Sequence, residues 1–183
     1  MSETEWYENL REQWKPENVR LLLIGESAPD DGGDPLNRRF FYAEPLSGAD
    51  NLFRSVVAAL YNGGKLTKGD RKEPWLRRLQ ADGVYLLDLS PVPVNALSAR
   101  DRRAALKGSV GDCVQRIADL SPEGIIVCHG PSFVLLEEPL LSAGLPLIHR
   151  SRIPFPLGNT RQEFIDKVRD ATRRRWPHYF RDL

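Results

Sequence analysis

Residues 19–25 read VRLLLIG, a run of five aliphatic side chains and one arginine that ends at a glycine. Three similar short, mainly apolar runs follow at 84–89, 124–128 and 145–149. Runs of this length bounded by glycine or proline are typical of strands buried on both faces of a parallel sheet. The last run contains Pro146, which has no backbone N–H to donate, so we expect this strand at an edge of the sheet.

Helix-periodic stretches separate the four runs. We expect one helix at 5–14, a second that begins at a cap on Asp50 or Asn51, and a third that begins at Pro74. A further helical stretch runs from Ser98 towards Leu120 with a break near Gly108. The last two helices are expected around 133–136 and after a capping box formed by Thr160 and Glu163. Alternating strands and helices predict an α/β protein with right-handed crossovers. The expected fold is a three-layer α/β/α sandwich with a central four-stranded parallel sheet, forming a single domain over residues 1–183.

The composition is that of an ordinary globular protein. Of the 183 residues, 41% are hydrophobic and 28% are charged, which excludes a disordered chain or a fibre. No apolar run approaches the roughly 18 residues that cross a bilayer, and the acidic start MSETEWYENL does not resemble a secretory signal. Two cysteines, Cys113 and Cys128, are too few for an iron–sulfur cluster held by four thiolates, and no His or Cys pair has metal-ligand spacing. We therefore expect a cytoplasmic protein without a metal, an iron–sulfur cluster, another cofactor or a membrane partner.

The charges are balanced overall but unevenly distributed. Lysine and arginine number 26 against 25 acidic residues, which gives a net charge of +1. Residues 148–183, however, hold nine basic residues against four acidic ones. Such a segment can present a positive face to phosphates, or it can be a solvated helix with a basic tail; composition alone leaves both interpretations open.

The chemistry is expected in the loops that follow the strands, because ligands of open parallel sheets bind beyond the carboxyl ends of the strands. The first such loop, 26–48, is too long for a simple connection and combines Glu26 with the aromatic run 40–42. The last loop, 150–159, carries two arginines and a serine ahead of a predicted helix. These segments hold the candidate functional residues.

The order of these motifs resembles the uracil-DNA glycosylase superfamily. The pattern Gly25-Glu26-x-x-Pro29 follows the first strand, an aromatic segment comes next, and His149-x-Ser151 follows the last strand. The resemblance extends over roughly 19–171 and rests on the order and spacing of short motifs. It implies a monomeric, monofunctional DNA glycosylase that hydrolyses the N-glycosidic bond of a deaminated base, uracil or a related one, in base excision repair.

The resemblance also implies a role for each candidate residue. Glu26 would orient water and stabilise the oxocarbenium-like sugar, while His149 would donate a hydrogen bond to the departing base. Phe41, favoured over Phe40, would stack on a base extruded from the DNA. The base-binding residues would be Ser27, Pro29, Phe41, Asp88 and Asn95, and the DNA backbone would be contacted by Arg150, Ser151, Arg152 and Arg161.

One position departs from the family pattern. Asp88 stands at the end of the second strand, where the superfamily usually has an asparagine that reads uracil. An ionised carboxylate only accepts hydrogen bonds, so it repels the O4 atom of uracil and suits a base that presents an amino group, unless it is protonated. Asn95, a few residues later, is the candidate that would compensate.

Two other functions are compatible with these residues. Gly25-x-Ser27 partly matches a nucleophile elbow, so Ser27 with His149 and Asp30 or Asp31 can be drawn as a serine-hydrolase triad. Pro29 follows where the elbow has a glycine, which weakens this alternative. The protein can also be a non-catalytic module of the same fold that binds nucleic acid or a nucleotide without cleaving it.

Overall fold

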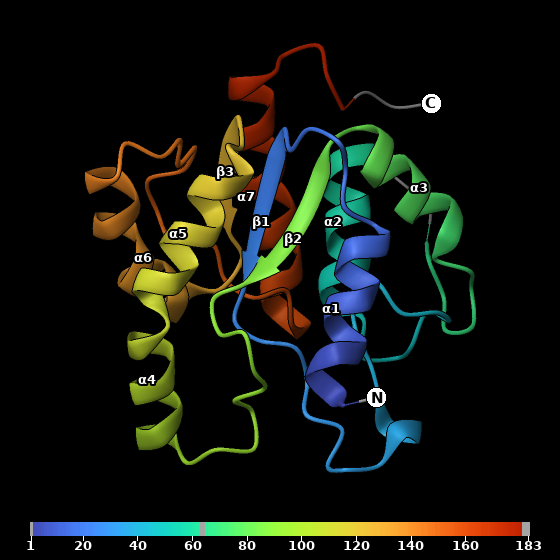
Figure 1. The fold of residues 1–183 in the computed structure, drawn as a ribbon. Helices are drawn as coiled ribbons and strands as arrows, with labels where there is room; N and C mark the ends of the chain where they lie inside the picture. The colour runs from blue at the N-terminus through green and yellow to red at the C-terminus, as the bar shows by residue number, and fades with distance from the viewer. Residues whose placement is uncertain (1, 63–64, 181–183) are drawn as a thin grey trace.

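The protein is built around a parallel β-sheet whose strands all point towards the same end of the molecule (Figure 1). The computed structural model describes residues 2–62 and 65–180. The sheet consists of β1 (Leu21–Gly25), β2 (Val84–Asp88) and β3 (Gly124–Val127), in the order β2-β1-β3. The central strand β1 is completely buried because it has a neighbour on each side and helices on both faces.

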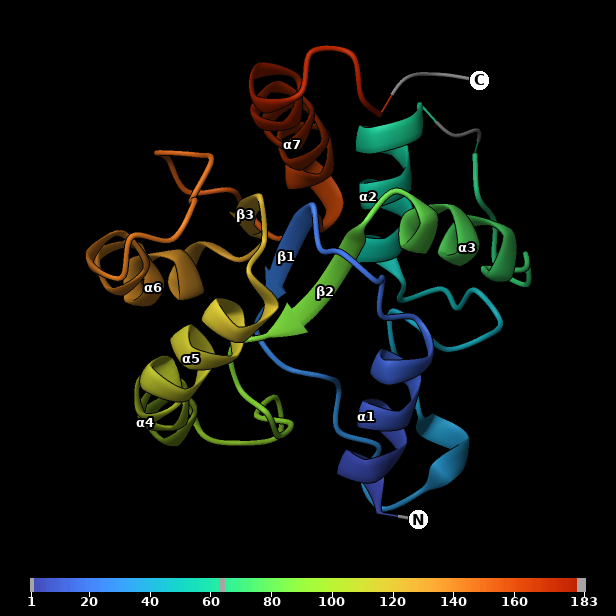
Figure 2. The same ribbon diagram turned by 45° about the horizontal axis from the view of Figure 1, so that its top comes forward.

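Seven α-helices pack around this sheet within the described residues. They are α1 (Glu3–Gln13), α2 (Asn51–Tyr61), α3 (Glu73–Ala81), α4 (Ala99–Gly108), α5 (Val110–Leu120), α6 (Gly130–Ser142) and α7 (Arg161–Arg175). Two short 3-10 helices, η1 (Pro35–Asn37) and η2 (Gly158–Thr160), lie in the loops. Helices α2 and α7 lie on one face of the sheet, and α1 and α5 lie on the other (Figure 2). The α/β class is therefore confirmed.

The fourth strand is a correction to the predicted sheet. The segment 145–149 pairs with β3 through a single bridge, between Ile125 and Leu147. Two backbone hydrogen bonds hold it, from the Ile125 N–H to the Pro146 carbonyl (2.8 Å) and from the Ile148 N–H to the Ile125 carbonyl (3.1 Å). Pro146 cannot donate, and the next outward N–H of β3, on Val127, donates to the imidazole of His149 instead of to a strand carbonyl. The sheet therefore has three strands and one bridge.

Two helix boundaries show how far local sequence signals define helix ends. The predicted break near Gly108 is confirmed, because α4 ends at Gly108 and α5 begins at Val110. The capping box predicted at Thr160 is wrong: the Thr160 hydroxyl donates to the carbonyls of Phe155 (2.7 Å) and Leu157 (2.8 Å), and it makes no cap bond to α7.

Within the described residues, no helix combines the length and apolarity that crossing a membrane requires.

Candidate functional site

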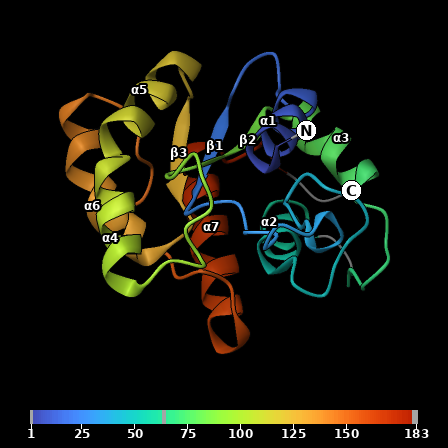
Figure 3. The same cartoon turned by 60° about the horizontal axis from the view of Figure 1, so that its bottom comes forward.

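A cavity of about 200 Å³ opens at the carboxyl ends of β1 and β2. Its walls come from residues 27–29 after β1, from residues 39–41 and 47–53 before and within α2, from β2 and from Phe155 in the loop before α7. Figure 3 looks onto this end of the molecule, where the loops that follow the strands lie together. The cavity is smaller than the roughly 300–1,000 Å³ of pockets for drug-sized ligands, so it suits a single flat ring system.

Aromatic side chains form one wall of this cavity. The Phe41 ring lies 5.1 Å from the Phe53 ring and 5.1 Å from the Tyr42 ring, centroid to centroid, in edge-on contacts. Phe40 also lines the cavity and packs against Tyr7 at 4.9 Å. These buried rings belong to the core and at the same time offer flat apolar surface, the kind on which a planar heterocycle stacks.

Asp88, at the end of β2, is the buried acid of the cavity. The residue is 5% exposed, and its Oδ2 pairs with Nη2 of Arg11, which is 2% exposed and reaches across from α1. The Arg11 guanidinium also lies 4.9 Å from the centroid of the Phe40 ring. Burial raises the pKa of Asp88, and the positive charge of Arg11 opposes that increase. A buried ion pair thus stands directly behind the cavity.

The other predicted base-binding residues are placed as follows. Ser27 and Pro29 line the cavity, and the Ser27 Oγ accepts a hydrogen bond from the Val94 N–H at 3.3 Å. Asn95 does not line the cavity, because its Oδ1 accepts the Asp30 N–H at 2.8 Å and ties the loop after β2 to the loop after β1. Asn95 as placed therefore does not compensate for Asp88.

Glu26 lies one residue before the cavity wall. Both of its carboxylate oxygens are bound by Arg102 of α4, with 2.6 Å between Nε and Oε1. The backbone carbonyl of Glu26 accepts the Ser90 N–H at 2.9 Å, which fixes the start of the loop against the chain leaving β2. The Arg102 side chain is 38% exposed and that of Glu26 is 16% exposed, so this pair lies at the rim of the site.

His149 does not face Glu26, contrary to the expected arrangement. Its Nε2 accepts the Val127 N–H at 3.0 Å, and its Nδ1 lies 2.9 Å from the Ser151 carbonyl, to which it donates. The Val127 N–H points away from β1, whereas the Cys128 N–H donates to Ile24 of β1, so β3 separates His149 from Glu26. Burial lowers the pKa of His149 and favours the neutral ring.

Both ring nitrogens of His149 are hydrogen-bonded to the backbone, and this bears on two predictions. As the ring is placed, it has no free N–H to offer a departing base, so the donor role implied by the resemblance has no geometric support at this residue. The serine-hydrolase triad fails for the same reason, because the hydroxyl of Ser27 meets the Val94 N–H and not an imidazole. His149 instead caps the open edge of β3.

His129 is the imidazole that sequence reasoning missed. The pairing of β1 with β3 sets Ile24 beside Val127, and two residues further along each chain stand Glu26 and His129. The His129 Nδ1 lies 2.8 Å from the Ser132 Oγ in the first turn of α6. Burial lowers the pKa of His129, Glu26 raises it, and Arg102 lowers it. Counting residues from the predicted end of each strand places Glu26 and His129 at the same level, and this count is the sequence signal for their proximity.

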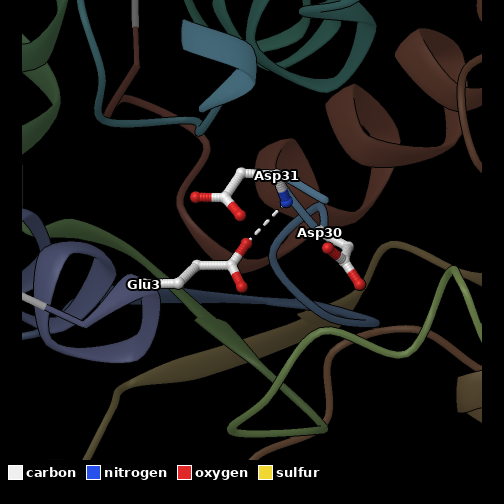
Figure 4. Close-up of side chains that lie close together, drawn as sticks. All are labelled: Glu3, Asp30 and Asp31. Carbon is white, nitrogen blue, oxygen red and sulfur yellow. Dashed lines mark hydrogen bonds between the residues drawn. The ribbon is translucent and has the colours of Figure 1, made fainter. Parts of the chain in front are cut away.

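Three carboxylates form a separate acidic cluster, composed of Glu3, Asp30 and Asp31 (Figure 4). One oxygen from each lies within 4.8 Å of the others, and oxygen ligands of this kind suit hard cations. Each carboxylate already has a protein partner: Glu3 accepts the Asp31 N–H (2.7 Å), Asp30 accepts the Gly32 N–H (2.6 Å), and Asp31 pairs with Arg38 (2.9 Å). Through these bonds the three carboxylates hold the loop after β1 in place.

The predicted DNA-contacting residues all lie on the surface. Arg150, Ser151, Arg152 and Arg161 are exposed, and the backbone carbonyl of Arg152 accepts a hydrogen bond from the Lys167 ammonium at 2.8 Å. Exposed guanidinium groups on a fixed loop suit contact with phosphates. Phosphate binding by this loop stays a prediction.

Comparisons of the chain with protein-family models, with curated proteins and with solved structures found no match.

Proposed function

We propose that this protein is a DNA-base glycosylase that hydrolyses the N-glycosidic bond of a deaminated base. The observation that carries the proposal is the cavity beyond β1 and β2, which contains Ser27, Pro29, Phe41 and Asp88, four of the five residues assigned to base binding from the sequence. These residues lie up to 61 positions apart in the chain (88 − 27 = 61) and come from three segments. The helices on both sheet faces support a three-layer α/β/α scaffold.

The cavity accepts one base that has been turned out of the DNA stack. Enzymes that act on a base extrude it and hold it between apolar or aromatic surfaces, because the reacting atoms are inaccessible inside a duplex. Phe41 provides such a surface, and Asp88 provides a polar group at the edge of the ring. The volume of about 200 Å³ limits the occupant to roughly the base itself, leaving the sugar at the rim.

The rim is where the bond would break. In the proposed hydrolysis, water attacks the anomeric carbon, the electron pair of the C–N bond leaves with the base, and the Glu26 carboxylate takes a proton from the water. The carboxylate also stabilises the positive charge that develops on the sugar. The departing base needs a proton or a hydrogen-bond donor, and we assign this part to His129, the imidazole nearest to Glu26 along the paired strands.

The test uses oligonucleotides that contain uracil, hypoxanthine or xanthine, followed by alkaline cleavage at abasic sites. The full-length protein is expected to release at least one of these bases, and Glu26→Gln is expected to reduce the rate about 100-fold by removing the proton acceptor. Glu17→Gln, the same change at an exposed position, is the control and should leave the rate unchanged. Equal rates for Glu26→Gln and the unmodified protein would contradict the assignment.

A non-catalytic binding module is the second candidate. The observation in its favour is that both carboxylate oxygens of Glu26 are already bound by Arg102, and that both ring nitrogens of His149 are hydrogen-bonded to backbone groups. A module of this kind would bind lesion-containing oligonucleotides without producing abasic sites. Measuring binding and cleavage on the same substrates separates the two functions.

A further inference from the structure

We propose that Asp88 makes the cavity select a base whose recognised edge presents an N–H donor flanked by at most one carbonyl, so that hypoxanthine is preferred to uracil. This inference rests on the proposed function and specifies its substrate. It depends on which groups bind each of the two carboxylate oxygens of Asp88. The positions of the sequence motifs do not determine these partners.

The two oxygens of Asp88 have different surroundings. Oδ2 is bound to Arg11, which does not line the cavity. Oδ1 accepts no hydrogen bond from any residue in 2–62 or 65–180, and it lies against the backbone of Gly25, where a Cβ atom would collide with it. Asp88 itself lines the cavity and is 5% exposed, so of its two carboxylate oxygens Oδ1 is the one that remains for an occupant.

Burial raises the pKa of Asp88, and Arg11 acts against that increase by favouring the charged form of the acceptor. Its guanidinium is 2% exposed and donates to Oδ2, so protonating Asp88 would leave a buried cation without its partner. Arg116 of α5 adds a second positive charge nearby and donates to the backbone carbonyls of Asp88 (3.2 Å) and Leu89 (3.0 Å). Glu8, which also pairs with Arg11, disfavours ionisation of Asp88.

A fixed acceptor discriminates between bases by the pattern along their edges. In uracil, the N3–H donor lies between two carbonyl oxygens, so a carboxylate that accepts this proton meets a repelling oxygen on each side. In hypoxanthine, the N1–H donor lies between one carbonyl and a C–H group, so one repulsion is removed. At the same ring position adenine presents the N1 lone pair, which repels a carboxylate placed to accept a proton there. The ring N–H gained on deamination is therefore the group that this placement reads, and the 6-amino group of adenine, itself a donor, lies one position away.

The experiment compares hypoxanthine with uracil in otherwise identical single-stranded oligonucleotides, measuring both the dissociation constant and the cleavage rate. The full-length protein is expected to prefer hypoxanthine by roughly tenfold or more in both measurements, because uracil brings one more carbonyl oxygen against the carboxylate. Asp88→Asn offers an amide whose acceptor and donor match the N–H and the adjacent carbonyl of either base, so it is expected to abolish the preference.

Two further variants keep the test decisive. Because Asp88→Asn leaves Arg11 without an anion, the double variant Arg11→Leu with Asp88→Asn removes both charges, and it should show the same loss of preference in a protein with restored thermal stability. Asp119→Asn makes the same chemical change at an exposed position of α5 and should not alter the preference.

The outcomes separate this inference from the proposed function. Preferential binding of hypoxanthine without cleavage would support the role of Asp88 while overturning the glycosylase activity. Cleavage with equal or greater preference for uracil, or an unchanged preference in both Asn variants, would overturn the role of Asp88 while leaving the activity intact. Failure to bind either oligonucleotide would overturn both.

Discussion

Two carboxylate–arginine pairs stand at the ends of neighbouring strands, and they differ in their exposure to water. At the end of β2, the side chains of Asp88 and Arg11 are 6% and 3% exposed. Just after β1, those of Glu26 and Arg102 are 16% and 38% exposed. The same chemical pair can therefore have two functions: the buried pair fixes a charge in one place, and the rim pair can exchange its partner for water or substrate.

The difference in exposure has energetic consequences. Desolvating two ions is expensive, so a buried pair adds little net stability, but removing one partner leaves an uncompensated charge in the interior. A pair at the surface is screened by water and costs little to break. These two pairs should accordingly respond very differently to the loss of their arginine.

The largest effect is expected from Arg11→Leu, which leaves Asp88 buried without its cation. The free energy of unfolding should fall by about 3–5 kcal/mol, measured by urea denaturation. Combining Arg11→Leu with Asp88→Asn should recover a large part of the loss, because the remaining charge disappears. Arg77→Leu, at a site where the side chain is 70% exposed, is the control. Equal losses for the single and double variants would contradict the pairing.

A much smaller change is expected from Arg102→Ala at the rim. Because this guanidinium is partly in water, the free energy of unfolding should change by less than about 1 kcal/mol. The measurement is the same urea titration, run beside Arg11→Leu. A loss comparable to that of Arg11→Leu would show that the two pairs do not differ in the way their exposure indicates.

The smallest effect is a shift in the titration of His129, which senses only the rim pair. Its pKa should lie below the ordinary histidine value of about 6.5, because burial disfavours the charged ring. Glu26→Gln removes a negative charge that stabilises the imidazolium, so the pKa should fall further, whereas Arg102→Ala should raise it. NMR titration of the ring protons measures both shifts; a pKa unaffected by either change would remove His129 from the site.

The strands and the sheet edge that holds the candidate site were predictable because they depend on local patterns. The run 19–25 is apolar throughout, and this pattern is enough to identify the central strand of a covered sheet. Pro146 correctly indicated a weak edge, since a missing N–H is a property of the residue itself. Ser27, Pro29, Phe41 and Asp88 were found because the carboxyl ends of parallel strands share one edge.

The partners of the charged and imidazole side chains were not predictable in the same way. Arg11 and Asp88 are 77 positions apart, and no periodicity within α1 identifies which strand its arginine will meet. His149 was assigned to catalysis from its motif, but its ring fills a hydrogen-bonding position that exists only because the neighbouring segment pairs at one point. His129 follows β3 as Glu26 follows β1, but which strand lies beside β1 is settled only in the folded sheet.

The imidazole on the Val127 N–H has a consequence for how the molecule behaves among other copies of itself. An outer strand with free amide groups is a template on which another chain can add a strand, and natural proteins blunt such edges to remain soluble. Here a side chain from the same polypeptide takes the hydrogen bond that an incoming strand would need. His149 therefore blocks intermolecular strand addition at this position on the β3 edge of the sheet.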